Sequence, residues 1–362
     1  MNAAAKTYDG KHKYIRITDI NEETSAFDPN PLSSPDGEYE EKYLVKENDI
    51  LFARTGASVG KSYLYNTKDG ELYFAGFIIR ARIKPVYNGA FIYYQTKSKK
   101  YEKWVNLTSM RSGQPGINSQ EYSSYTIGMT SRTEQDKIAD FLLGLDRKIA
   151  VQNKIIEDLK VLKKELCNRH FKSVHDDTSL EYVSLKSILT ERKEYCGKDG
   201  TYIHGTLSKE GVSTKTERYD RDFLVKSEDK QYKVTHYNDI CYNPANLKFG
   251  VICRNTYGDL IFSPIYVTFE ISNAVYPAYI ELFLTNANFI GRIRRYEQGT
   301  VYERMAVSAE DFLSYETRMP EYDEQVKFAN KIQRIQEKID LETSFLGSLQ
   351  QQRKYLLNAM FI

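Results

Sequence analysis

The stretch that decides the fold of this sequence occurs twice. Residues 134–171 read EQDKIADFLLGLDRKIAVQNKIIEDLKVLKKELCNRHF, and residues 324–361, at an offset of 190, read EQVKFANKIQRIQEKIDLETSFLGSLQQQRKYLLNAMF. Apolar residues recur in both at alternating steps of four and three, a spacing that predicts long helices with one apolar face. At 1.5 Å per residue, each helix spans roughly 55–60 Å. Self-similarity over this length predicts a duplicated unit.

The apolar positions of both stretches form an a/d seam, as in paired helices. The seam residues are Ile138, Leu142, Leu145, Ile149, Ile156, Leu159 and Leu166 in the first helix, and Phe328, Ile332, Ile335, Ile339, Leu346, Leu349 and Leu356 in the second. Both seams break at equivalent positions, Gln152 and Lys163 against Glu342 and Arg353. Shared breaks favour pairing of the two helices over packing of each along its own lobe. We expect an antiparallel pair about a pseudo-twofold axis, with Lys163 opposite Glu342 and Gln152 opposite Arg353.

The repeat extends into the segment before each helix. The tripeptide Asn-Asp-Ile at 48–50 recurs at 238–240, and Gly60 recurs as Gly250. Short runs rich in Ile, Val, Tyr and Phe alternate with turns, which predicts an α+β lobe in each copy. We therefore predict a first lobe over residues 1–130, a first spacer helix over 131–173, a second lobe over 174–321 and a second spacer helix over 322–362. The second lobe opens with Thr178–Gly197, where the first has only Met1–Tyr8, which indicates a shortened or recombined first lobe.

Composition narrows the class of protein. The 362 residues are 41% hydrophobic and 28% charged, which indicates a globular chain of about two domains. The net charge of +2 argues against a binder of DNA that ignores sequence, because such proteins are usually much more basic. No apolar run approaches the ~20 residues of a membrane span, and no secretory signal is seen, so we expect a cytoplasmic protein. Four cysteines without a CxxC pair and five scattered histidines predict no metal site.

Two stretches resemble catalytic motifs without completing them. Gly56–Ser62 resembles a phosphate-binding loop but has three residues between its glycines instead of four, and a predicted strand follows it instead of a helix. Asn243-Pro244-Ala245 lacks the second proline and the aromatic residue of an adenine methyltransferase loop. A nuclease or methyltransferase would need a site that the sequence does not display, so we expect a protein that is not an enzyme and carries no cofactor.

Polar loops at equivalent positions are the candidate DNA contacts. Arg54–Lys61 matches Asn243–Gly250, and Arg111–Asn118 roughly matches Gln298–Arg304. Arginine suits guanine edges and side-chain amides suit adenine edges, while basic runs suit phosphates. The predicted contacts are Arg54, Thr55, Ser58, Lys61, Arg111, Ser112 and Gln114 in the first lobe, and Asn243, Asn246, Lys248, Arg292, Arg294, Arg295, Gln298, Thr300, Tyr302 and Arg304 in the second, with Lys97, Lys99, Lys100 and Lys103 as a further basic run. Unlike loops on a repeated framework suit two different half-sites.

At these residues the sequence resembles the specificity subunit of type I restriction–modification systems. The marks are the Asn-Asp-Ile signature before a glycine-containing loop and the helix start Met319–Gln325, which completes the Pro-x-x-x-Glu-Gln pattern of that family. In the first copy Thr130 replaces the proline ahead of Glu134-Gln135. The order and the duplication of these motifs carry the resemblance over nearly the whole chain.

The resemblance implies two target-recognition domains separated by antiparallel helices, and double-stranded DNA with a bipartite target as ligand. It also implies two methyltransferase subunits docked on the helices, with S-adenosylmethionine on those partners, and restriction subunits outside them. No membrane is implied. The alternative is a coiled-coil scaffold whose lobes bind proteins instead of DNA, which a test of salt-dependent, sequence-selective duplex binding would separate.

Overall fold

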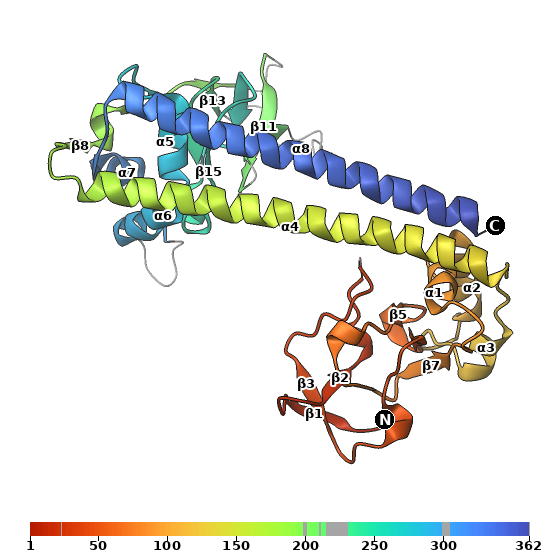
Figure 1. The fold of residues 1–362 in the computed structure, drawn as a ribbon. Coiled ribbons are helices and arrows are strands. Elements are labelled where there is room, and N and C mark those ends of the chain that lie inside the picture. The colour runs from red at the N-terminus through yellow and green to blue at the C-terminus, as the bar shows by residue number, and fades with distance from the viewer. Residues whose placement is uncertain (23, 198–200, 210, 215–230, 299–304, 362) are drawn as a thin grey trace. The chain divides into compact units, whose positions relative to one another are not determined.

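The computed structural model describes residues 1–22, 24–197, 201–209, 211–214, 231–298 and 305–361. Contacts divide the chain into two units, one of Met1–Lys154 with Thr343–Ile362 and one of Ile155–Glu342. Each unit holds a lobe and parts of two long helices, α4 (Arg132–Asp176) and α8 (Tyr322–Met360) (Figure 1). The helices expected over 131–173 and 322–362 therefore run to these bounds. Among the described residues, no helix is long and apolar enough to cross a membrane.

The first lobe is built from short strands and three short helices. A three-stranded antiparallel sheet has the order β5 (Ser62–Leu64), β4 (Asp49–Ala53), β7 (Ile78–Arg82). Two further pairs are β2 (Lys13–Ile15) with β6 (Leu72–Phe74), which are parallel, and β1 (Ala4–Thr7) with β3 (Ser33–Asp36), which are antiparallel. The helices are α1 (Gly89–Gln95), α2 (Lys99–Thr108) and α3 (Ser119–Ser124). The lobe is thus α+β, with β4 in the middle of its sheet.

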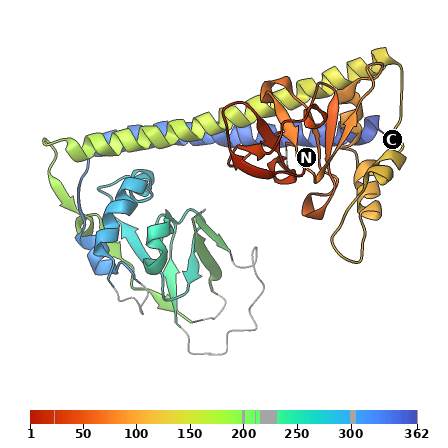
Figure 2. The ribbon, with the colours of Figure 1, turned by 90° about the horizontal axis from the view of Figure 1, so that it is seen from below.

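The second lobe repeats this frame and adds strands. Its central sheet has the order β15 (Ile252–Arg254), β14 (Ile240–Tyr242), β17 (Val267–Ile271), β9 (Leu189–Glu191). A five-stranded sheet has the order β10 (Tyr195–Cys196), β13 (Tyr232–Thr235), β16 (Leu260–Phe262), β11 (Ile203–Ser208), β12 (Gly211–Thr214), and β18 (Glu316–Arg318) pairs with β8 (Tyr182–Ser184). The helices are α5 (Pro277–Leu284), α6 (Ala287–Ile293) and α7 (Ala309–Ser314) (Figure 2).

One turn recurs before the central strand of both lobes. Asn48 and Asn238 adopt φ values of 64° and 75°, a left-handed conformation that asparagine tolerates better than most residues. The aspartates that follow are buried, and each accepts two hydrogen bonds from an arginine guanidinium. Asp49 accepts them from Arg82 on the neighbouring strand β7, whereas Asp239 accepts them from Arg192, directly after β9. The Asn-Asp-Ile motif therefore builds a turn with a buried ion pair, and the lobes draw the arginine from different places.

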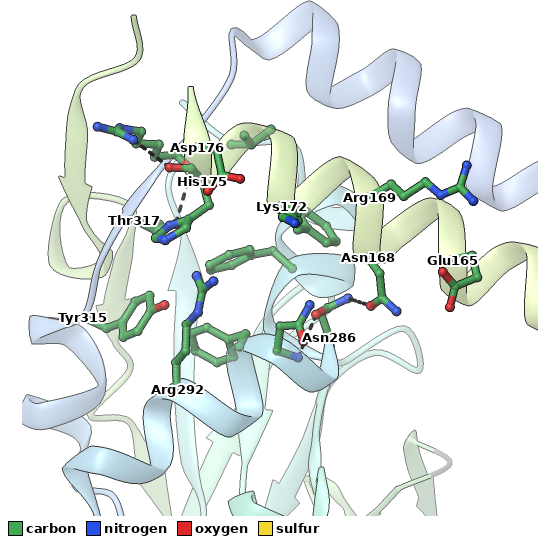
Figure 3. A pocket seen from close by; sticks show the side chains of 16 residues that line it. Glu165, Asn168, Arg169, Lys172, His175, Asp176, Asn286, Arg292, Tyr315 and Thr317 are labelled. Carbon is green, nitrogen blue, oxygen red and sulfur yellow. Dashed lines mark hydrogen bonds between the residues drawn. The ribbon is translucent and has the colours of Figure 1, made fainter. Parts of the chain in front are cut away.

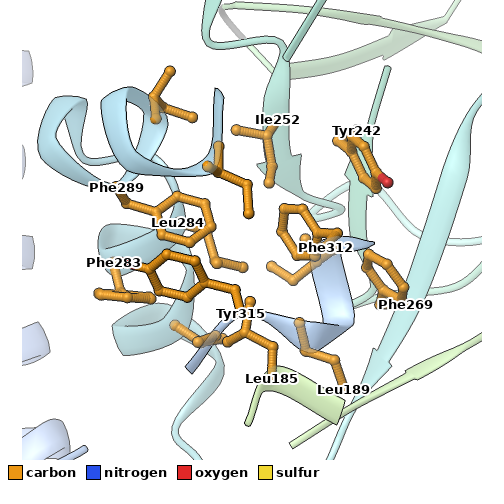
Figure 4. Close-up of a cluster of buried hydrophobic side chains, with 14 of the residues drawn as sticks. Leu185, Leu189, Tyr242, Ile252, Phe269, Phe283, Leu284, Phe289, Phe312 and Tyr315 are labelled. Carbon is orange, nitrogen blue, oxygen red and sulfur yellow. The ribbon is translucent and has the colours of Figure 1, made fainter. Parts of the chain in front are cut away.

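Both long helices contribute to the core of each unit. In the first unit, Ala139 and Leu142 of α4 and Leu357 of α8 pack with Phe91 and Ile50 of the lobe. The larger core of the second unit joins Phe171 of α4 and Ile332 of α8 to an aromatic cluster in the lobe. Figure 4 shows that cluster, in which Tyr242, Phe269 and Phe312 stack with ring centroids 4.9–5.8 Å apart. The helices are thus part of the folded units and do not stand free of them.

The pairing register predicted from the polar breaks is wrong. In the second unit Lys163 donates to Gln336 with an N–O distance of 2.7 Å, six residues before its predicted partner Glu342. Further along α4, His170 stacks on Phe328, so contacts move forward on α4 and backward on α8, and the helices run antiparallel there. Glu342 instead pairs with Lys338 of its own helix. Apolar seam residues pack in either register, and therefore the seam alone did not fix the pairing.

The other predicted pair also differs. In the first unit Arg353 donates to Asp146 of α4 instead of facing Gln152. The same carboxylate accepts a hydrogen bond of 2.8 Å from the Tyr94 hydroxyl of helix α1. Asp146 therefore connects both long helices to the lobe. Asp146 lies off the apolar seam, and the sequence pattern gave no reason to single it out.

The buried histidine His170 of the second unit should make the stability of the protein depend on pH. His170 stacks on Phe328 with ring centroids 3.6 Å apart and shares a hydrogen bond of 3.0 Å with the Tyr279 hydroxyl. Burial lowers its pKa to about 4, below the value near 6.5 of an exposed histidine. As pH falls below 6.5 the unfolded chain binds a proton that the folded chain refuses, so stability decreases toward pH 4. We expect His170→Met, which copies Met360 of the other repeat, to reduce the loss of Tm between neutral pH and pH 5.

His236 provides the control of opposite sign. Burial lowers its pKa, but the hydrogen bonds to Asp259 and Glu194 outweigh burial and leave the pKa raised. Its contribution is present below the unfolded pKa and is lost as pH rises through the folded pKa. His236→Gln should therefore deepen the loss of Tm on acidification. If His170→Met leaves the loss of Tm unchanged or deepens it, the assignment to His170 fails.

Candidate nucleic-acid interface

Three segments converge at one end of the first lobe's central sheet. The loop Arg54–Lys61 joins β4 to β5, and its Arg54 carbonyl accepts a hydrogen bond of 2.9 Å from the amide of Ile117 in the second candidate loop. The Gly56 amide donates to the Pro115 carbonyl at the same distance, and the Arg54 amide donates to the carbonyl of Phe77. The two loops that the sequence analysis singled out in this lobe therefore lie side by side.

The glycine that closes the first loop is required by packing. Gly60 has φ 85°, and a Cβ at this position would lie 2.5 Å from a methyl carbon of Val105 on α2. The Tyr101 hydroxyl of the same helix donates to the Gly60 carbonyl at 2.9 Å. A side chain here would push the loop off α2. Gly60 thus fixes the loop to the helix, which presents the preceding residues at the surface.

The second lobe makes the equivalent junction. Its Val307 amide donates to the Pro244 carbonyl at 3.3 Å, and these residues lie 190 positions after Ile117 and Arg54. Tyr242 fixes the same place, because its buried hydroxyl donates to the Val307 carbonyl at 3.0 Å. Gln298 and Ala306 exchange two backbone hydrogen bonds at the base of the other loop. The loop between them carries the predicted contacts Thr300, Tyr302 and Arg304, which lie outside the described residues.

The candidate side chains of the first lobe fall into two groups. Arg111 donates to the Thr108 and Met110 carbonyls and pairs with Glu121, so it joins the end of α2 to α3. Lys61 is held by Glu22 at 2.6 Å. Among the described residues, no ion pair engages the Arg54 side chain. The members of the second group, which make no side-chain hydrogen bond within the described chain, are Arg54, Thr55, Ser58, Ser112 and Gln114.

The second lobe separates its candidates in the same way. Asn243 is 8% exposed, and its side-chain oxygen accepts from the Ala245 amide at 3.1 Å, so it caps the 3-10 turn Pro244–Phe249. Asn246 is exposed on that turn. Lys248 lies over the Phe249 ring at 5.4 Å from its centroid. The local role of Asn243 makes Asn246 the better placed amide for an adenine edge.

The basic residues predicted to contact phosphates differ in their exposure, and the prediction for Lys97 is wrong. Lys97 is not a surface cation, because its ammonium donates to the carbonyl and hydroxyl of Ser62 and to the Ser25 hydroxyl at 2.8–3.0 Å. Burial lowers its pKa to about 7. Arg294 lies 4.0 Å from Glu297, and Arg292 lines a cavity. The remaining basic candidates that are exposed are Lys99, Lys100, Lys103 and Arg295.

The sequence analysis missed an apolar position beside the loops. In the antiparallel register of each central sheet, Phe77 lies opposite Arg54 and Ile265 lies opposite Pro244. Each is 62% exposed. Phe77 lies directly before β7, and Ile265 lies two residues before β17. A large apolar side chain of the same exposure therefore recurs in both copies of the frame. The signal was present in the sequence, since an offset of 188 equates Phe77 with Ile265.

The long helices carry a second feature that the seam analysis overlooked. Val151 and Ile155 on α4 are 59% and 38% exposed, one helical turn apart. Their equivalents at an offset of 190, Leu341 and Phe345 on α8, are 62% and 52% exposed. We call these pairs the α4 patch and the α8 patch. Apolar pairs of this exposure therefore recur at matching positions of the repeat, one pair on each long helix.

Cofactor sites of the usual kinds do not appear in the part of the chain that the structure describes. No group of three or more His, Cys, Asp or Glu residues there could hold a metal ion. The four cysteines are free thiols, three of them buried. Strand β5 follows Gly56–Lys61 directly, so this loop does not open the helix that a phosphate-binding loop requires.

Comparison with known proteins points to one family. Residues 1–161 match the family model described as "Type I restriction modification DNA specificity domain". No match was found among curated protein sequences. A similar solved structure is the type I restriction-modification system S subunit from M. genitalium, 16% identical, with a TM-score of 0.55 over 100% of this chain and 96% of that one.

A second similar structure comes from a study of "complex assembly and conformational transition of the type I R-M system". It is 11% identical and has a TM-score of 0.58 over 96% of this chain and 90% of that one. At these identities the likeness shows a shared fold. That fold extends over residues 162–362, which the family model does not reach.

Proposed function

We infer that this chain, whose residues 1–161 match the model of a type I restriction modification DNA specificity domain, is the DNA-recognition subunit of a type I restriction–modification system. The observation that carries the inference for both lobes is the repeated loop junction. Arg54 with Ile117, and Pro244 with Val307, make the same hydrogen bond 190 residues apart, yet the loops around them differ in sequence. Two lobes with the same framework but different loop sequences suit a DNA target made of two different half-sites.

The lobes read bases through a small set of free side chains. In the first lobe Arg54 and Gln114 are unpaired within the described residues. The Gln114 side chain lies against the loop that carries Arg54, since a Cβ at Gly56 would be 3.0 Å from Gln114 Nε2. Arginine can donate two hydrogen bonds to a guanine edge, and glutamine can pair with an adenine edge. In the second lobe the side-chain amide of Asn246 pairs with an adenine edge. Phe77 and Ile265 stand beside these groups and suit an apolar contact such as a thymine methyl group.

The chain does not catalyse. We propose that it positions methyltransferase subunits, one at the α4 patch and one at the α8 patch, and that those partners bind S-adenosylmethionine and methylate adenine. Restriction subunits join outside them. The matching positions of the two patches support two copies of one partner, because equivalent surfaces on a duplicated frame can bind identical subunits.

A substitution series tests the assignment of half-sites. We expect Arg54→Ala and Gln114→Ala to relax sequence preference in one half of the target, and Asn246→Ala to relax the other, each by about 1–3 kcal/mol where a base contact is lost. The measurement is a map of methylated adenines in cells that express the variant with its methyltransferase. Lys100→Ala, an exposed cation on α2, is the matched control and should weaken binding to all sequences alike.

Three results would contradict the proposed function. Uniform weakening by Arg54→Ala and Asn246→Ala would make both residues phosphate contacts. Methylation of DNA by the isolated chain with S-adenosylmethionine would make the chain itself an enzyme. Absence of sequence-selective binding in the complex with methyltransferase would favour the scaffold alternative.

A further inference from the structure

A cavity of about 390 Å³ in the second unit belongs to none of the surfaces above. It lies between the last turns of α4, helix α6 and strand β18 (Figure 3). Its walls include the edges of Phe171, Phe283 and Phe289. The charged side chains that line it are four cations and two carboxylates, namely Arg169, Lys172, Arg292 and Arg318 against Glu165 and Asp176. The lining therefore carries an excess of two positive charges, four less two.

None of the four cations of this cavity has a carboxylate partner among the described residues. Within the described chain, Arg169, Lys172 and Arg292 have no carboxylate within 4.0 Å. Arg318 donates to the His175 carbonyl at 2.6 Å, but its buried Nε has no hydrogen-bond partner. Figure 3 shows Arg292 extending from α6 toward the side chains of α4. Arg169 and Lys172 are exposed, so the buried donor without a partner is Arg318 Nε. Leaving such a donor unpaired costs free energy, and a bound anion would offset that cost.

The other copy of the repeat shows that the frame does not need these charges. A smaller cavity of about 250 Å³ at the equivalent place in the first unit is lined by Phe361 and Tyr125, the counterparts of Phe171 and Tyr315. There the counterparts of the cations are uncharged: Arg169, Arg292 and Arg318 correspond to Ala359, Trp104 and Gly128. The aromatic walls thus belong to the repeated frame, whereas these three arginines do not. The charged residues that line the first cavity are Lys100 and Glu134, which balance each other.

We propose that this cavity binds a phosphate monoester, either free phosphate or the phosphoryl group of a nucleotide. A phosphate monoester carries close to two negative charges above its second pKa near 6, which matches the excess of two positive charges in the cavity lining. A single carboxylate would neutralise only one of those two charges. Guanidinium groups bind phosphate oxygens through paired donors. The cavity is recessed, so it suits a small molecule better than the convex backbone of a duplex.

Calorimetric titration of the full chain tests the proposal. The probes are inorganic phosphate, AMP and acetate at constant ionic strength and at a pH above the second phosphate pKa. We expect saturable binding of phosphate and of AMP, with acetate much weaker. Tighter binding of AMP would identify a nucleotide and assign the aromatic walls to its base, and equal affinities would identify free phosphate. Arg292→Gln should weaken binding about tenfold or more, since it removes charge-assisted hydrogen bonds.

Arg295→Gln is the matched control, because Arg295 is an exposed arginine three residues away that does not line the cavity. Lys172→Gln gives a second variant on the opposite wall and should also weaken binding. The proposal is overturned if neither phosphate nor AMP binds saturably, if acetate binds as tightly, or if Arg295→Gln weakens binding as much as Arg292→Gln. Weaker duplex binding by Arg292→Gln with unchanged phosphate binding would also overturn it, while leaving the DNA-reading function intact.

Discussion

Replacing both residues of the α4 patch, Val151→Glu with Ile155→Glu, is expected to remove one methyltransferase subunit from the complex and leave one. The same change in the α8 patch, Leu341→Glu with Phe345→Glu, is expected to remove the other subunit, and the four changes together should abolish the complex and methylation with it. Each exposed apolar side chain contributes about 1.5–3 kcal/mol when a partner buries it fully, and a carboxylate placed there adds the cost of its desolvation. Native mass spectrometry of the co-expressed complex counts the subunits directly.

The control for this prediction places the same charges elsewhere on the same helices. Lys164 and Lys354 are identical, exposed and equivalent in the repeat. At 3.6 residues per turn, Lys164 lies about half a turn around α4 from Ile155. Lys164→Glu with Lys354→Glu should keep both partner subunits. Loss of both subunits from a change in one patch alone would contradict two independent docking surfaces.

The sequence predicted the long helices correctly because their apolar residues recur with a regular period. The helices follow from the three-and-four spacing, and the candidate loops from their positions between the conserved elements of the repeat. The predicted register was wrong because an apolar seam repeats every seven residues, so the seam alone does not distinguish registers that differ by one heptad. The partner that decided it, Asp146, lies off the seam and gave no periodic signal.

Side-chain roles were harder to predict than positions, because one residue type serves several purposes. Lys97 reads as a surface cation in a basic run, yet the fold buries its ammonium against Ser62. Asn243 and Asn246 are both amides of one loop, but only the first caps the turn that it begins. Whether such a side chain is free to bind a ligand depends on its exposure, and exposure depends on contacts between residues far apart in sequence. For the same reason the α4 and α8 patches appear only once the faces of the helices are known.

The aromatic residue near the end of each long helix should show how far the two units depend on their helices. We expect Phe171→Ala to lower the free energy of unfolding by about 3–5 kcal/mol, the usual cost of removing a buried phenylalanine. Its ring contacts those of Tyr279, Phe283 and Phe328, with centroids 5.5–5.8 Å apart. Phe361 contacts one ring, that of Phe91, at 5.5 Å. Because fewer neighbours surround it, Phe361→Ala should cost less, nearer the lower end of that range.

Urea unfolding measures the loss of stability in each variant, and hydrogen exchange shows which lobe is destabilised. Phe171→Ala should increase amide exchange in α5 and the central sheet of the second lobe, and Phe361→Ala in α1 and β4 of the first. Phe141→Ala, an equal truncation at a half-exposed site on α4, is the control and should change stability by less than about 0.5 kcal/mol. If Phe171→Ala and Phe361→Ala instead accelerate exchange equally in both lobes, the units fold as one cooperative body. The half-site variants would then have to be checked for stability across the whole chain before any loss of sequence preference is assigned to one lobe.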